Sequence, residues 1–164
     1  LVYMSNRDAF SHDLVLEREV PVAAENLWNG WTNPEVIVKW FTPKPWVTTE
    51  AEINLEPGGI FRTVMCGPDG ERNEGDGCVL EVIEHRRFVW TSAMGPGFQP
   101  VAAPTDGFLF TAILEFTPTD GGALYRATAR HSTPEDAAMH AEMGFHAGWG
   151  EALNQLVALY VKEP

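Results

Sequence analysis

The stretch from Pro134 to Val161 reads PEDAAMHAEMGFHAGWGEALNQLVALYV, and no other segment of the 164-residue sequence is long and periodic enough to be a major helix. Apolar residues recur along it at helical spacing, so one face of the helix is apolar over most of its length. We therefore predict one long helix over 134–161 that packs on the rest of the domain. Its apolar face contains Ala138, Trp149, Leu153, Leu156, Val157 and Tyr160, with Met139 and Phe145 at the edges.

Three glycines interrupt this predicted helix. Gly144, Gly148 and Gly150 together should cost about 3 kcal/mol relative to alanine, at about 1 kcal/mol each. Two features could offset that cost, namely close packing on a sheet or a bend that makes room for a ligand. Close packing is the more common reason.

Two polar residues fall inside the apolar face. Glu142 and His146 stand four residues apart, so their side chains can meet on a helix. A carboxylate held away from water and an imidazole beside it could exchange a proton near neutral pH, which makes the pair a candidate catalytic acid and base. The more common alternative is a structural ion pair or hydrogen bond. Its partner would be Arg18, Arg62 or Arg126. A further alternative is that this end of the helix simply reaches solvent.

Upstream of this helix the sequence predicts a sheet. A strand over 12–20 comes first, and two short helices over 23–31 and 36–41 follow it. The resulting fold class is α+β, with a curved antiparallel sheet of six to seven strands wrapped around the closing helix. This helix-grip arrangement encloses a space between sheet and helix. The further strands are predicted over 46–55, 59–66, 74–84, 87–94, 108–117 and 122–131.

Two segments are predicted as loops at the mouth of that space. Residues 95–107 read GPGFQPVAAPTDG and contain three prolines and three glycines, a composition that predicts a long irregular connection. Long connections in small domains often serve as lids. The stiff loop at 42–46 is expected to close the mouth from the other side.

Charge and composition limit the function classes. The 23 acidic and 11 basic residues give a net charge of −12, which disfavours nucleic acid and anionic membrane surfaces as partners. No stretch reaches the length of a membrane span and no signal peptide is seen, so we expect a cytoplasmic protein. Residues 1–11 lack periodicity and are expected to be poorly ordered, which leaves 12–164 as a single domain. Met4 is a candidate native start.

The two cysteines could form a disulfide or could both be reduced. Cys66 and Cys78 fall in strands predicted to be adjacent, so a cross-strand disulfide is conceivable. Two reduced thiols in a cytoplasmic protein are the more common case.

The chain also resembles a known family. It is similar to the bacterial relatives of the activator of heat-shock-protein ATPase C-terminal domain, within the START-like (SRPBCC) superfamily, from about residue 12 to residue 161. The resemblance implies the helix-grip fold and a cavity between the sheet and the long helix. It rests on Arg18, Pro21, Leu27-Trp28, Thr32-Asn33-Pro34, Trp40-Phe41, Pro57-Gly58-Gly59, Phe61-Arg62, Asp69-Gly70, Gly77, Glu81-Val82, Phe88-Val89-Trp90-Thr91, Leu114-Glu115-Phe116, Gly121-Gly122, Arg130-His131, Gly148-Trp149, Leu153 and Leu156.

Function follows less closely from the resemblance, because the superfamily includes lipid carriers, hormone receptors, aromatic-polyketide cyclases and oxygenase domains. We expect binding of a hydrophobic or aromatic small molecule in the cavity. The alternatives are a cyclase- or hydrolase-type enzyme that uses Glu142 and His146, and a protein-interaction domain. No cofactor is expected, and a homodimer is compatible with the sequence.

The candidate ligand-binding residues are those expected to face the cavity. Trp28 and Phe61 are further aromatic candidates, and His140 is expected at the surface because it lies opposite Trp149 on a continuous helix. No metal site is predicted, although Glu142, His146 and His131 are suitable ligand types. The candidate set is Trp40, Arg62, Trp90, Phe110, His131, Glu142, His146 and Trp149.

Overall fold

Seven antiparallel strands form one continuous sheet in the computed structural model, which describes residues 12–161. Their order across the sheet is β1-β9-β8-β5-β4-β3-β2. Residues 1–11, for which we predicted poor order, lie outside the described residues. The strands are β1 (Asp13–Val20), β2 (Val47–Ile53), β3 (Ile60–Cys66), β4 (Arg72–Ile83), β5 (Arg87–Thr91), β8 (Thr111–Thr119) and β9 (Gly122–Arg130).

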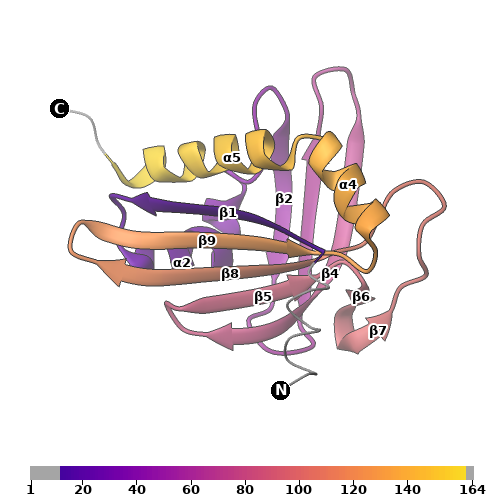
Figure 1. Cartoon of the computed structure of the whole chain (residues 1–164), viewed down its shortest axis with the longest axis horizontal. Helices are drawn as coiled ribbons and strands as arrows, with labels where there is room; N and C mark the ends of the chain where they lie inside the picture. The colour runs from indigo at the N-terminus through magenta and orange to yellow at the C-terminus, as the bar shows by residue number, and fades with distance from the viewer. Residues whose placement is uncertain (1–11, 162–164) are drawn as a thin grey trace.

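The sheet curves strongly around the C-terminal helices. In Figure 1, β2 and β4 run up the view while β1, β9 and β8 run across it, and helix α5 (Phe145–Tyr160) lies across the concave side. Two short helices, α2 (Ala24–Thr32) and α3 (Pro34–Ile37), follow the first strand as predicted. The α+β helix-grip architecture is therefore confirmed, although the predicted helix over 36–41 is in fact the shorter α3, which begins at Pro34.

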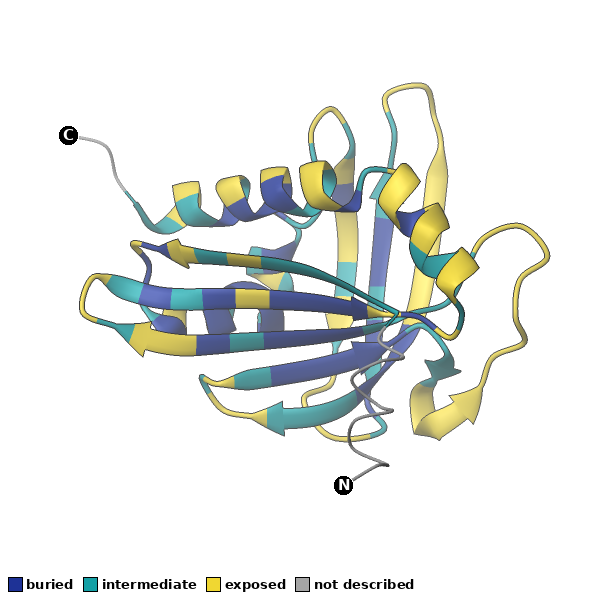
Figure 2. Ribbon diagram, viewed as in Figure 1, coloured by how far each residue is buried: buried dark blue, intermediate teal, exposed yellow. Residues whose placement is uncertain are grey.

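The core lies between the sheet and the helices. Buried residues are concentrated along the strands of the sheet, while the outward sides of the helices and the long loop before β8 are exposed (Figure 2). Ala112 and Ala129 are opposite each other on β8 and β9, and Leu114 is opposite Ala127. All four side chains are fully buried. The small side chains of Ala127 and Ala129 on β9 allow close packing on this part of the sheet.

The closing helix is broken, and here our prediction of one helix over 134–161 was wrong. Helix α4 (Pro134–Glu142) ends before Gly144, and α5 begins after it. Gly144 has φ of 96°, a left-handed conformation that glycine adopts without steric cost. The glycine therefore produces a bend, the second of the two explanations we considered. The N-terminus of α4 is capped by Thr133, whose hydroxyl accepts from the backbone N–H of Asp136 at 3.1 Å.

The segment 95–107 is more ordered than predicted. It begins within a small hairpin formed by β6 (Met94–Gly95), the 3-10 turn Pro96–Phe98 and β7 (Gln99–Pro100). The backbone N–H of Gly97 donates to the Gly58 carbonyl at 2.8 Å, which ties this hairpin to the turn before β3.

Both cysteines are free. Cys66 is opposite Arg72 and Cys78 is opposite Ile60, so the two lie at opposite ends of the β3–β4 pair. The cross-strand disulfide is therefore ruled out by register. No helix within residues 12–161 has the length and apolar character needed to cross a membrane.

Candidate functional site

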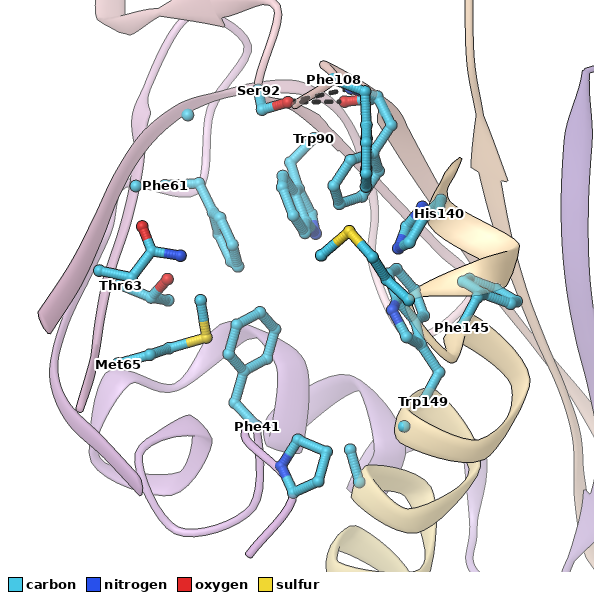
Figure 3. A pocket seen from close by; sticks show the side chains of 18 of the residues that line it. Phe41, Phe61, Thr63, Met65, Trp90, Ser92, Phe108, His140, Phe145 and Trp149 are labelled. Carbon is cyan, nitrogen blue, oxygen red and sulfur yellow. Dashed lines mark hydrogen bonds between the residues drawn. The ribbon is translucent and has the colours of Figure 1, made fainter. Parts of the chain in front are cut away.

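A cavity of about 490 Å³ lies between the concave side of the sheet and the helices. Its wall is mainly aromatic and draws on segments far apart in the sequence, from α2 to α5 (Figure 3). The lining residues that matter for its chemistry are Trp40, Phe41, Phe61, Thr63, Trp90, Phe108, Phe110, Tyr125, His140, Phe145 and Trp149.

Ring-to-ring contacts hold one side of this wall in place. The rings of Phe61 and Trp90 are stacked, with centroids 4.4 Å apart, and Phe110 meets Trp90 edge-on at 5.5 Å. Phe110 also contacts Trp149 of α5 at 6.0 Å, and Phe145 lies 4.7 Å from Trp149. Such offset and edge-to-face pairs are favourable arrangements of aromatic quadrupoles. The cavity wall is therefore a connected aromatic network that spans sheet and helix.

Strand β3 separates the cavity from the charged exterior. Phe61, Thr63 and Met65 line the cavity, since alternate residues of a strand face the same side. Arg62 faces away, and its guanidinium lies 3.2 Å from Glu74 and 3.4 Å from Glu50. The hydrogen bond to Glu74 raises the pKa of Arg62, and the same contact lowers the pKa of Glu74. Arg62 therefore lies outside the cavity lining, contrary to our prediction that it binds ligand.

Glu142 and His146 are not brought together in the cavity. Both side chains are exposed, and neither belongs to the cavity lining among the described residues. A ring nitrogen of His146 lies 3.2 Å from the carbonyl oxygen of Val15, at the edge of β1. The i, i+4 pairing assumed a continuous helix, and Gly144 interrupts it between the two residues. The structure therefore does not form the predicted acid–base pair of Glu142 and His146.

His140, instead of Glu142 and His146, is the polar residue of this helical region that lines the cavity. Its side chain is buried and lines the cavity, contrary to the predicted surface position. Nδ1 of His140 lies 2.9 Å from Nε2 of His131, and Nδ1 of His131 lies 2.8 Å from the carbonyl oxygen of His12. Burial, together with the nearby His131, lowers the pKa of His140 to about 4. The cavity therefore contains a neutral imidazole at ordinary pH.

One buried donor of the wall has no partner. The indole N–H of Trp90 is buried and makes no hydrogen bond to any described residue. Two other indoles of the lining differ: Trp40 donates to the Gly30 carbonyl at 2.9 Å, and Trp31 donates to the Tyr125 hydroxyl at 3.1 Å. Native proteins rarely leave a buried donor unpaired, so this group calls for an explanation.

The two predicted loops contribute unequally to the mouth. Pro43, from the loop 42–46, lines the cavity beside Gly148 of α5. The described lining includes no residue of 95–107, because the chain rejoins the wall only at Phe108. Met143, which lines the cavity and is 72% exposed, marks the opening next to the bend at Gly144.

Of the eight candidate site residues, Trp40, Trp90, Phe110 and Trp149 line the cavity, and His131 supports it from behind His140. Trp28 does not line it, whereas Phe61 does. Within residues 12–161, no three side chains of metal-ligating type come together, and His131 is not grouped with Glu142 and His146.

Comparison with known proteins agrees with this architecture. The family model for Activator of Hsp90 ATPase homolog 1-like protein matches residues 21–160. A crystal structure from Nitrosomonas europaea is 43% identical, with a TM-score of 0.85, over 90% of this chain and 92% of that chain. One from Mycobacterium smegmatis is 26% identical, with a TM-score of 0.78, over 94% and 93%.

More distant structures share the fold alone. The solution structure of an AHSA1-like protein from Aeromonas hydrophila is 20% identical, with a TM-score of 0.66, over 88% of this chain and 89% of that chain. Among curated proteins, no sequence matches the chain.

Proposed function

Since the chain belongs to the family of Activator of Hsp90 ATPase homolog 1-like proteins, within the START-like superfamily, we propose that it binds a hydrophobic or aromatic small molecule in the internal cavity. The observation that carries this proposal is the aromatic cavity of about 490 Å³. Small-molecule sites typically enclose about 300–1,000 Å³ behind mainly apolar walls with a few polar groups. The cavity has both properties.

The charges around the cavity favour an uncharged ligand. Of the described lining residues, Asp76 alone carries a formal charge at neutral pH, and its carboxylate lies 3.6 Å from Arg62. Transfer of an unpaired charge into an apolar site is strongly unfavourable. A neutral ligand avoids that cost.

The enzyme alternative loses the residues on which it rested. Glu142 and His146 are exposed and lie outside the described lining, so they cannot act on a molecule inside the cavity. The interaction-domain alternative would be favoured by a large apolar surface patch without an interior cavity. The aromatic cavity therefore supports small-molecule binding.

A pair of variants at one position tests the proposal. Gly148 lines the cavity, and a Cβ there would have Pro43 Cγ, at 3.9 Å, as its nearest neighbour beyond the helix. Gly148→Phe should fill the space, while Gly148→Ala should leave it open and serve as the matched control. Both remove a glycine from the interior of α5, so both should gain helix stability.

The measurement is a thermal-shift screen with neutral aromatic compounds, followed by native mass spectrometry of the protein with each hit. We expect wild type and Gly148→Ala to bind the same compounds, and Gly148→Phe to lose binding while remaining folded. Equal binding by all three proteins would place the ligand elsewhere. Failure of every compound with the wild type would overturn the proposal.

We also propose a cytoplasmic location, which the two free cysteines support because disulfides are rare in reducing compartments. A homodimer would have the outer edge of β2 available for pairing, since β2 is the last strand of the sheet. Light scattering coupled to size-exclusion chromatography distinguishes monomer from dimer.

A further inference from the structure

A backbone carbonyl sets the direction of the hydrogen bonds that lead to the cavity. The carbonyl oxygen of His12 can only accept, so Nδ1 of His131, 2.8 Å away, must carry the proton. A neutral imidazole carries one proton, and Nε2 of His131 is therefore an acceptor. Nδ1 of His140, 2.9 Å from it, must then donate. The remaining nitrogen of His140, Nε2, is left with a free lone pair.

The surroundings of His140 disfavour a charge on its ring. His131 and His140 are 5% and 7% exposed. The groups around the pair are aromatic, because Phe108 and Phe110 contact both rings and Phe145 and Trp149 contact His140. No carboxylate forms an ion pair with either histidine among the described residues. Desolvation without a counter-charge disfavours the imidazolium form.

The lone pair of His140 faces the cavity. Nδ1 and Nε2 lie on different sides of the ring, and Nδ1 is held by His131, which is not part of the cavity lining. His140 itself lines the cavity, and Figure 3 shows its ring directed inward from α4, across from Trp90. The cavity wall therefore presents one fixed acceptor.

A donor without a partner stands near that acceptor. The Trp90 side chain is 7% exposed, and its indole N–H makes no hydrogen bond to a described residue. Trp90 and His140 both pack on the Phe110 ring, with centroid distances of 5.5 Å and 5.0 Å. The two side chains therefore flank the same aromatic ring, and both line the cavity.

We propose that this pair selects a neutral aromatic ligand that carries a hydroxyl group, which donates to Nε2 of His140 and accepts from the Trp90 N–H. The proposal rests on the proposed function and narrows its ligand class. An ether or ketone could accept from Trp90 but would place an oxygen lone pair against that of His140. A hydrocarbon would leave both groups unpaired, and unpaired buried groups are a strong source of discrimination.

Matched probes test the selection directly. Isothermal titration with 2-naphthol, 2-methoxynaphthalene and naphthalene compares ligands of nearly the same shape. We expect 2-naphthol to bind about fivefold more tightly than the other two, as one buried hydrogen bond of average strength would give. Equal affinities for the three would overturn the hydroxyl selection and leave apolar binding intact. No binding by any probe would overturn both proposals.

Two variants assign the effect to its residues. His140→Phe removes the acceptor and Trp90→Phe removes the donor, and each keeps an aromatic ring in place. We expect each variant to bind 2-naphthol several-fold more weakly while its affinity for naphthalene stays within about twofold of the wild-type value. Unchanged selectivity in His140→Phe would overturn the role of His140.

The tautomer can be read without any ligand or substitution. In ¹⁵N-labelled wild-type protein at neutral pH, long-range nitrogen–proton correlation spectra should show Nε2 of His140 without a proton and Nδ1 with one. His131 should show the same tautomer. A protonated Nε2 on His140 would overturn the proposal whatever the binding data show.

Discussion

The indole N–H of Trp31 donates to the hydroxyl of Tyr125 at 3.1 Å and so joins α2 to β9 across the core. Both side chains are 2% exposed. The contact closes the end of the domain where the two short helices cover the sheet. It also positions two residues that line the cavity.

Tyr125→Phe should therefore destabilise the protein. It removes the acceptor and leaves the Trp31 N–H buried without a partner, a loss of about 1–3 kcal/mol in the free energy of unfolding. Urea denaturation of the wild type and the variant measures this loss. Tyr160→Phe is the control, because the Tyr160 hydroxyl accepts from Asn29 at 2.8 Å in a partly exposed position where water can replace it. Equal losses in the two variants would contradict this account.

The same hydroxyl should respond to alkaline pH. Complete burial raises the pKa of Tyr125 well above its ordinary value of 10. The unfolded state releases this proton at a lower pH than the folded state does, so the stability is complete below about pH 10 and falls as the pH rises further. Ultraviolet titration should show the Tyr125 phenolate only as the protein unfolds. A reversible phenolate signal from all three tyrosines in the folded protein would contradict the prediction.

Two glycine-to-alanine changes should have opposite effects. In Gly30→Ala the new Cβ would collide with Cδ1 of Leu156 on α5, a fully buried side chain, so we expect a net loss of roughly 1–2 kcal/mol. Gly148→Ala meets nothing closer than 3.9 Å and should gain about 1 kcal/mol of helix propensity. Thermal denaturation shows whether each variant is less or more stable than the wild type. A gain in Gly30→Ala would show that Leu156 repacks freely.

Acid should weaken the fold through His140. Its pKa falls from 6.5 to about 4 on folding, so the unfolded state binds the proton more readily between these values. Above about pH 6.5 His140 is neutral in both states and does not lower the free energy of unfolding. The free energy of unfolding decreases as the pH falls from 6.5 toward 4. The loss should be on the order of 3 kcal/mol, given about 1.4 kcal/mol per pKa unit.

Urea denaturation of the wild type and of His140→Phe at several pH values measures the contribution of His140 by difference. We expect a shallower dependence in the variant between pH 6.5 and 4, since phenylalanine takes up no proton. Parallel curves for the two proteins would mean that His140 is protonated in the folded state as readily as in the unfolded state.

Most of the architecture could be predicted from local patterns. Local apolar patterns predicted the strands of the main sheet, and apolar periodicity from Pro134 onward predicted the closing helical region. These signals are local, because the alternation of a strand and the periodicity of a helix depend on residues close in the sequence. The residue order also supported the family resemblance, which the family match over 21–160 confirms.

The polar part of the site could not be predicted, because it depends on the conformation of one residue. On a continuous helix His140 would lie opposite Trp149, and Glu142 would face the sheet with His146. The left-handed conformation of Gly144 turns α4 relative to α5, which buries His140 and exposes Glu142. Glycine content indicated a bend or close packing, but its direction is a property of the tertiary structure.

Arg62 and Trp90 illustrate two further limits. The sequence alone does not show which side of the sheet Arg62 faces. In the structure Phe61 and Thr63 line the cavity, and Arg62 between them contacts Glu50 and Glu74 on the outer side. The aromatic character of Trp90 was visible in the sequence, but the absence of a partner for its N–H was not. A missing hydrogen bond can be recognised only when every neighbouring acceptor has a position.

The alternation along β3 has an evolutionary consequence. Phe61, Thr63 and Met65 contribute to the cavity, while Arg62 between them holds the acidic side chains of the outer surface. Selection can therefore change the inward residues, and with them the preferred ligand, without altering the surface that governs solubility and encounters with other macromolecules. A scaffold divided in this way can acquire new ligands through single substitutions.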